Sequence, residues 1–326
     1  MRKPGRLAVV LSAVLASTSC GLVGGGSAEP SSAEYPTREV RIIVPFAAGG
    51  TTDLISRTIA AGLEPRLGQP VVVENRPGAG GGNAYNEVLR GEPDGYTLCD
   101  LSLPFAVISS TREDVGYTVD QLQPIGVVTR NPNVIVVPAA SPHQRAADLF
   151  AAAQAQPGEV EIATAGATVS AHVEMERLDR EYGVPLKPVP FEGVAPAVAA
   201  LLGGNVDAGI IDASKDTLRR IEAGELRPLA ITSAERADYL QEVPTLKELG
   251  FPELTLSVSI DGLAGPAGMP PEVVGKLEAA LRETLRDPQV LATIGENYIP
   301  AEFISGTELA ATVRELQTTY AQVLNP

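Results

Sequence analysis

Apolar positions along the chain follow two periods, one typical of buried strands and one typical of amphipathic helices. Val40–Val44 is an almost continuous apolar, β-branched run, which predicts a buried strand. Apolar residues then recur at helical spacing from position 54 to position 67, so we expect a helix from about Thr52 or Asp53. Residues 45–53 between them are therefore predicted to be a turn that connects a strand to a helix.

The same alternation continues along the chain, with glycine-rich turns at residues 77–82 and 164–168. Further strands are expected at residues 70–74, 96–101, 134–138, 160–163, 186–190, 206–211 and 229–232. Further helices are expected at residues 85–89, 146–155, 169–182, 195–202, 271–285, 290–294 and 307–324. Strands that alternate with helices predict an α/β protein with a mainly parallel sheet covered on both faces.

Two apolar runs, residues 134–138 and 254–260, are expected to carry the chain into a second lobe and back. We therefore assign residues 36–138 plus 258–326 to lobe 1 and residues 139–257 to lobe 2. Residues 1–20 are assigned to an export signal, and residues 21–35 to a flexible tether rich in Gly, Ser and Pro.

The N-terminus has Arg2, Lys3 and Arg6, followed by a short apolar stretch and small residues up to Cys20. This order is typical of an export signal, and the apolar stretch is too short to span a membrane. Cys20 resembles the lipid-attachment cysteine of bacterial lipoproteins, although Ser17 stands where that pattern prefers Leu. An ordinary cleaved signal is the alternative. We expect an exported protein, anchored through Cys20 to the outer face of the cytoplasmic membrane or periplasmic.

The net charge excludes one class of partner. It is −15, and removal of residues 1–19 would take away three positive charges and leave −18. A chain this acidic is not expected to bind nucleic acid. The two cysteines and two histidines form no cluster in the sequence, so we expect no metal and no cofactor.

The turn at residues 45–53 suits an anion. Gly49 and Gly50 allow backbone N–H groups to face a ligand, and the helix that follows contributes the positive end of its dipole. The turn contains no Lys or Arg, so peptide N–H groups and hydroxyls would hold the anion. Residues 164–168 form a second turn of the same kind, and four N–H bonds to a carboxylate would contribute about 6–12 kcal/mol.

Ordered blocks along most of the chain resemble one known family. Residues 44–53, 67–81 and 93–98 resemble the solute-binding proteins of tripartite tricarboxylate transporters, the Bug family, as do residues 190–193, 201–207, 229–233, 243–245 and 265–268. The resemblance implies a two-lobed periplasmic-binding-protein fold of type II, a Venus flytrap. It also implies a monomer that closes on a small carboxylate and delivers it to membrane permease subunits.

Site residues follow from the turns and from the resemblance. The candidate ligand-binding residues are Phe46, Ala47, Gly49, Gly50, Thr51, Thr52, Asp53, Gly166, Ala167, Thr168, Val169, Ser170, His172 and Asp212. Thr168 departs from the family, which usually has glycine there, and its side chain is expected to narrow the cleft. Asp53 is interpreted chiefly as a cap of the turn, because its charge would repel a carboxylate.

Three interpretations of the function are weighed. Transport and ligand sensing share the binding step, so a sensing partner of a membrane histidine kinase is the alternative to a transport protein. An enzyme acting on a small carboxylate is a remote alternative, because no G-x-S-x-G elbow is present and the first turn lacks the lysine of a phosphate-binding loop. We therefore predict no catalytic residue.

Overall fold

The computed structural model describes residues 35–324. The predicted export signal, Cys20 and tether residues 21–34 lie outside the described residues. Tyr35, predicted to end the tether, is buried, and its hydroxyl donates a hydrogen bond to the Gly95 carbonyl at 2.7 Å. This residue therefore belongs to the folded protein rather than to a tether.

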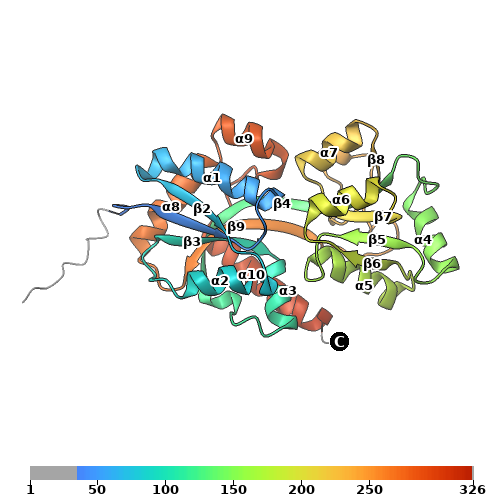
Figure 1. Cartoon of the computed structure of the whole chain (residues 1–326), viewed down its shortest axis with the longest axis horizontal. Coiled ribbons are helices and arrows are strands. Elements are labelled where there is room, and N and C mark those ends of the chain that lie inside the picture. Colours follow the sequence, from blue (N-terminus) through green and yellow to red (C-terminus); the bar gives the residue numbers. More distant parts are fainter. Residues whose placement is uncertain (1–34, 325–326) are drawn as a thin grey trace, which may run out of the picture. The chain divides into compact units, whose positions relative to one another are not determined.

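Helices and strands alternate through most of the described chain (Figure 1). The strands are β1 (Val40–Val44), β2 (Val71–Asn75), β3 (Thr97–Leu103), β4 (Leu122–Pro138), β5 (Glu161–Thr164), β6 (Lys187–Pro190), β7 (Ala208–Asp212), β8 (Leu226–Ile231) and β9 (Val258–Pro266). The α-helices are α1 (Thr51–Leu67), α2 (Gly82–Leu89), α3 (Phe105–Arg112), α4 (Ala146–Ala155), α5 (Ser170–Tyr182), α6 (Val194–Leu202), α7 (Lys215–Glu222), α8 (Pro271–Thr284), α9 (Pro288–Ile294) and α10 (Gly306–Leu324).

Two long strands connect the two lobes. The strand order is β2-β1-β3-β9-β4-β7-β5-β6, with β8 paired to β4. β1 pairs in parallel with β2 and β3, and β5 pairs in parallel with β6 and β7. β4 pairs antiparallel with β9 up to Pro132, and from Asn133 onward it pairs with β7 and β8. The lobe boundaries at residues 138 and 258 stay a prediction. Strand β4 changes its pairing partner between Pro132 and Asn133, which is before residue 138.

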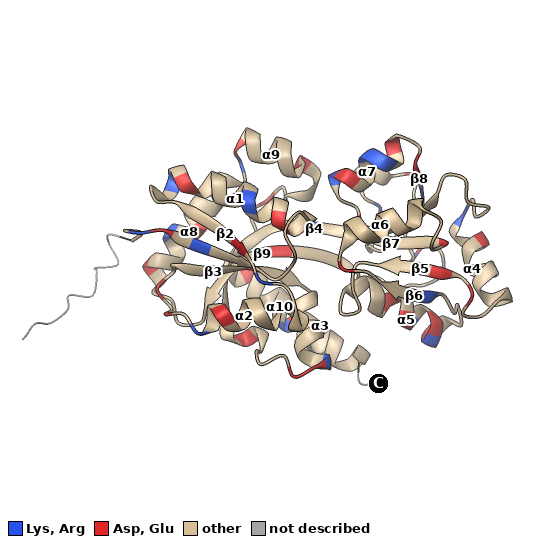
Figure 2. Cartoon of the chain, in the orientation of Figure 1, with Lys and Arg blue, Asp and Glu red and all other residues tan. Residues whose placement is uncertain are grey.

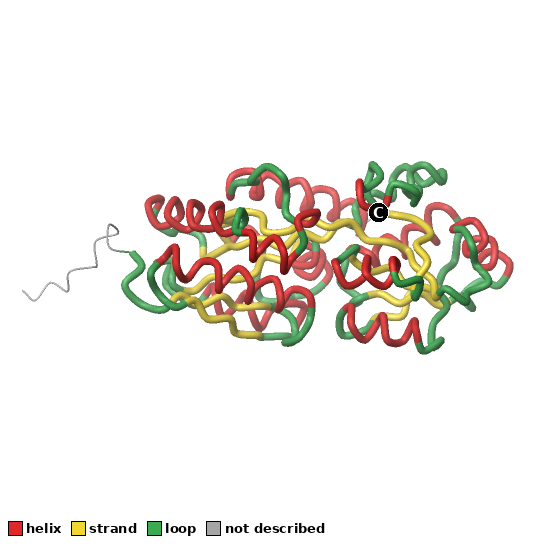
Figure 3. The backbone as a smooth tube through the Cα atoms, turned by 90° about the horizontal axis from the view of Figure 1, so that it is seen from above, coloured by secondary structure: helices red, strands yellow, loops and turns green. Residues whose placement is uncertain are grey.

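Alternate residues of the central strands pack into layers on opposite faces. On β1, Ile42 packs with the buried side chains of α1 and α8, whereas Ile43 packs with those of α2, α3 and α10. On β4, Ile135 packs toward α4 and α5, and Val136 packs toward α6. Helices therefore flank the strands on both sides, as Figure 3 shows. Strands buried on both faces explain why the sequence has continuous apolar runs instead of strict alternation.

Most elements lie close to their predicted positions, but α3, α7 and much of β4 were not predicted. α3 follows Pro104 and has the β-branched sequence Phe-Ala-Val-Ile, which favours a strand locally. The first part of β4 contains Pro124, Gly126 and Pro132, which interrupt the apolar pattern. Pairing with β9 holds this segment extended, with register shifts at the irregular positions. Among the described residues, no helix is both long and apolar enough to cross a bilayer.

Candidate functional site

A cavity of about 240 Å³, here called the inner cavity, lies where segments of both lobes meet. Its walls come from the first turns of several helices and from the central part of the long strands. The inner cavity is lined by residues 46–52, 102–105, 169–171 and 192–196, together with Asn131, Asn133, Ala165, Ile210, Asp212, Ser259 and Asp261. The lining combines much of the predicted site with residues that the sequence analysis did not select.

Four helices begin at the inner cavity. The first residues of α1, α3, α5 and α6 all line it. Among the described residues, no acceptor is present for the N–H groups of Thr51 and Thr52 on α1, or of Ser170 and Ala171 on α5. The N–H groups of Val194 and Ala195 on α6 are unpaired in the same way. Unpaired N–H groups and the positive ends of helix dipoles make these starts suitable for an anion.

In the turn before α1, the N–H of Gly49 is bonded within the protein, so its predicted role of facing a ligand stays a prediction. Gly49 has a φ of +87°, and its N–H donates to the Asp53 carboxylate at 2.9 Å. Burial alone would raise the pKa of Asp53, but hydrogen bonds from Arg57 and Gly49 outweigh it and lower the pKa. Asp53 does not line the inner cavity. Its carboxylate therefore organises the turn in the structure, in agreement with its interpretation as a cap.

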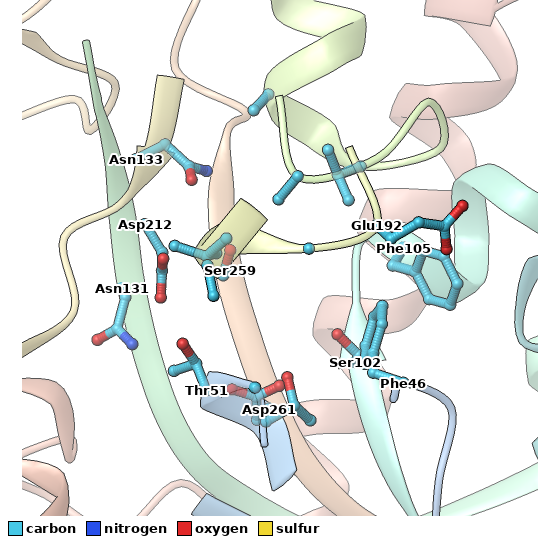
Figure 4. Close-up of a pocket in the computed structure, with 18 of the residues that line it drawn as sticks. Phe46, Thr51, Ser102, Phe105, Asn131, Asn133, Glu192, Asp212, Ser259 and Asp261 are labelled. Atoms are coloured by element: carbon cyan, nitrogen blue, oxygen red, sulfur yellow. The ribbon is translucent and has the colours of Figure 1, made fainter. Parts of the chain in front are cut away.

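Polar side chains from three strands form what we call the floor of the inner cavity: Asn131 and Asn133 on β4, Ser259 and Asp261 on β9, and Asp212 on β7. On each long strand these residues are two positions apart, so they share one face. Asn131 pairs in register with Ser259, and Asn133 pairs with Asp212. In Figure 4, Asp212, Asn131 and Thr51 lie near one another on one side of the cavity.

The sequence analysis selected only Asp212 from this floor. A polar residue at every second position of an otherwise apolar run, as in Asn131–Asn133 and Ser259–Asp261, is the signal that could have found the others. This signal was hidden because the first part of β4 was not recognised as a strand.

The acids of the floor are buried and lack basic neighbours on the cavity wall. Asp212 is 8% exposed and Asp261 is 6% exposed. Burial and the nearby Asp261 raise the pKa of Asp212 to about 7. Burial raises the pKa of Asp261 to about 6, although the Thr129 hydroxyl donates a hydrogen bond to its carboxylate at 2.9 Å. Of the residues that the structure describes, no Lys or Arg lines the inner cavity.

The opposite side of the inner cavity is aromatic. Phe46 and Phe105 have ring centroids 4.9 Å apart, and Figure 4 shows Glu192 beside Phe105. Phe46 also packs against the hydrophobic core of lobe 1. Phe46 is therefore both a wall of the cavity and a neighbour of the core.

Of the candidate residues in and after the second predicted turn, residues 164–168, only some line the inner cavity. Val169 and Ser170 line the inner cavity, but Gly166, Ala167, Thr168 and His172 do not. His172 Nδ1 lies 3.2 Å from the Thr164 hydroxyl, and burial lowers its pKa. The role of these four residues in ligand binding stays a prediction, and Thr168 does not narrow the inner cavity in this structure.

This turn instead contacts the other lobe. The Arg112 guanidinium on α3 donates to the Ala167 carbonyl at 3.3 Å and forms an ion pair with Glu176 on α5. Contacts of this kind connect the two sides of the cavity at one end of the cleft.

A larger outer cavity of about 720 Å³ shares Gly49, Gly50 and Thr51 with the inner one. Asp53, Arg57 and charged residues of α7 line it. Figure 2 shows that basic and acidic residues alternate along the ribbon of α7. The inner cavity, by contrast, has acids without bases. Within residues 35–324, no group of three or more His, Cys, Asp or Glu side chains is placed to hold a metal ion.

Comparison with known proteins identifies the family. A sequence model described as "Tripartite tricarboxylate transporter family receptor" matches residues 55–315. This chain belongs to that family. Protein BugT of Bordetella pertussis is 37% identical to this family member over 270 residues, which cover 82% of each chain.

Solved structures of receptor proteins are similar over nearly the whole described chain. MatC from Rhodopseudomonas palustris with bound malate has 28% identity and a TM-score of 0.80, covering 89% of this chain and 100% of that one. R. palustris Rpa4515 with adipate has 30% identity and a TM-score of 0.79, covering 89% and 97%. These similarities confirm the predicted two-lobed periplasmic-binding-protein fold and the resemblance to transport receptors.

Proposed function

We propose that this receptor captures a small carboxylate in the inner cavity, between its two lobes, and delivers it to the membrane permease of a tripartite tricarboxylate transporter. The observation that carries the proposal is that, within residues 35–324, four helices begin at one cavity and no Lys or Arg lines it. Helix N-termini bind carboxylates through N–H groups that are already oriented, so no cationic clamp is needed.

The energetics are adequate for this role. Each N–H bond to a carboxylate contributes about 1.5–3 kcal/mol net because the acceptor is charged. The unpaired N–H groups of α1, α5 and α6 can supply several such bonds. The six unpaired N–H groups would together contribute about 9–18 kcal/mol, whereas micromolar affinity needs about 8 kcal/mol net, so most of them are required once the costs of association are included. The role is one of binding and release, and it requires no catalytic residue.

The neighbours with bound malate and adipate support a dicarboxylate-sized site. Export and attachment of Cys20 to lipid would place this site outside the cytoplasmic membrane, where a permease could receive the ligand. The arrangement works with a monomer, because both sides of the inner cavity come from one chain.

Isothermal titration calorimetry of the purified protein with mono-, di- and tricarboxylates, malate and adipate included, tests the proposal. We expect at least one carboxylate to bind with a dissociation constant in the micromolar range. Uptake of that compound by cells should then require both the receptor and its permease. Absence of binding to every carboxylate would contradict the proposed function.

Two substitutions of Thr51 separate its backbone N–H from its hydroxyl. Thr51→Pro removes the N–H at the first position of α1, where proline fits the helix, and Thr51→Val keeps it. We expect Thr51→Pro to weaken carboxylate binding about 10- to 100-fold, the equivalent of one charged hydrogen bond. Equal losses in the two variants would mean that the hydroxyl, rather than the helix start, holds the ligand.

A further inference from the structure

The inner cavity has two chemically different ends. Helix starts and unpaired N–H groups surround much of it, which favours an anion. The floor presents Asp212 and Asp261, and Glu192 also lines the wall, while no basic side chain of the described part of the chain does so. A ligand with only carboxylates would place negative charge near buried acids. Such a pairing is unfavourable where water is excluded.

Hydrogen-bond acceptors without partners on the floor indicate that the ligand carries a hydrogen-bond donor. Asp212 Oδ1 is buried and has no hydrogen-bond partner, and the same is true of Asn131 Oδ1. The side chain of Asn131 is 3% exposed, and both residues line the inner cavity. Buried acceptors without partners are rare and costly, so the site is incomplete without a group that donates hydrogen bonds.

Asp261 completes this arrangement from the neighbouring strand. Its Oδ2 accepts a hydrogen bond from Thr129, so its orientation is fixed by a buried partner. Burial, together with the charge of Asp261, raises the pKa of Asp212 to about 7. The two acids and Asn131 therefore place oxygen acceptors on the same floor of the inner cavity. An ammonium group has three donors and a positive charge, and it suits this environment best.

We propose that the ligand carries an ammonium group bound by Asp212, Asp261 and Asn131, in addition to a carboxylate bound at the helix starts. The ligand is then an amino acid or a related amino-carboxylate rather than a plain di- or tricarboxylate. This inference rests on the proposed function and specifies its substrate class. Phe46 and Phe105 form the wall against which the carbon skeleton packs.

Matched ligand pairs provide the test. Succinate, malate and aspartate share a skeleton and differ in one substituent, and adipate and 5-aminopentanoate differ by replacement of a carboxylate with an amine. All are titrated into the purified protein, together with the twenty common amino acids and the acids that lack their amino groups. We expect the tightest ligand to carry an ammonium group and to bind at least about tenfold more tightly than its partner without one.

The outcomes separate the two proposals. Plain carboxylates that bind as tightly as their amino partners would overturn this inference and leave the proposed function standing. Failure of every compound to bind would overturn the proposed function, and this inference with it.

Substitutions of the floor identify the residues responsible. Asp261→Asn and Asp212→Asn should each weaken the best amino-bearing ligand about tenfold or more and should not weaken its plain counterpart. Glu174→Gln is the matched control, because Glu174 is also a buried acid, does not line the inner cavity and does not shift the pKa of Asp212 or Asp261. It should preserve the preference between ligands. Loss of affinity for both ligand classes in Asp261→Asn, with unchanged thermal stability, would contradict the assignment.

Whether the protein takes up or releases protons when the ligand binds is an independent test of the proposal. Near pH 6.5 the acids of the floor are partly protonated, since the pKa of Asp212 is about 7 and that of Asp261 is about 6. An ammonium group between them would release protons, whereas a carboxylate there would cause proton uptake. Calorimetry in buffers of different ionisation enthalpy distinguishes the two, and uptake would overturn the proposal. The other titratable groups that influence these acids are Asp100, Asp216, Tyr239 and Tyr298.

Discussion

Gly49 occupies a backbone conformation that side chains other than glycine rarely adopt. Its φ is +87°, and a Cβ atom built there would meet no other atom within 4 Å. The constraint is therefore on the backbone and not on space. Because the Gly49 N–H binds the carboxylate of Asp53, the conformation of this one residue determines how the turn presents the start of α1.

At the residue scale, we predict that Gly49→Ala impairs ligand binding and costs about 1–2 kcal/mol of stability, the usual cost of a left-handed alanine. Gly68→Ala is the matched control, because Gly68 has a φ of +69°, also faces open space and ends α1 away from the inner cavity. Both variants should lose similar stability in thermal unfolding. Only Gly49→Ala should lose affinity in calorimetry, and equal affinities would show that the turn tolerates rearrangement.

A helix contributes to the binding site through the position of its first residues. α6 starts after Gly193, whose φ is +120°, and its first residues line the inner cavity. The sequence predicts this helix from Ala195, but gives no sign that its start faces the same space as the start of α1. That relation depends on β5, β6 and β7, which place α6 at the end of lobe 2 that faces lobe 1.

At the element scale, Val194→Pro should weaken carboxylate binding about 10- to 100-fold, because it removes one unpaired N–H at the first position of α6. Val194→Ala keeps the N–H and changes the side chain, so it should bind nearly normally. Calorimetry on both variants measures the difference. If the alanine variant loses as much affinity as the proline variant, the valine side chain rather than the helix start is responsible.

Buried acids make the folding stability of the whole molecule depend on pH. Burial raises the pKa of Asp212 to about 7 and that of Asp261 to about 6, and burial also raises that of Glu174, beside Arg177, to about 7. These folded-state pKa values lie above those of the unfolded chain, so the folded protein binds more protons. Their stabilising effect is complete below the unfolded pKa of about 4 and is lost as the pH rises through 6 to 7.

At the scale of the whole molecule, we predict that the thermal midpoint without ligand falls as the pH rises from about 5 to about 8. Asp212→Asn should reduce this fall, because asparagine does not ionise. Asp53→Asn serves as the control: hydrogen bonds lower the pKa of Asp53 against the effect of burial, so its contribution is lost toward low pH instead. An unchanged slope in Asp212→Asn would show that this carboxyl is not the group that titrates.

The sequence by itself determined the alternation of strands and helices, the strand-to-helix turn at residues 45–53 and the family of the chain. These features are local, because continuous apolar runs, glycines and helical spacing act within a few residues. The tertiary structure alone decided that α3 is a helix, that β4 begins at Leu122 and that Asp261 and Asp212 line the same cavity. The reason is physical: strand pairing across more than a hundred residues, as between β4 and β9, brings together groups whose spacing in the sequence carries no sign of their proximity.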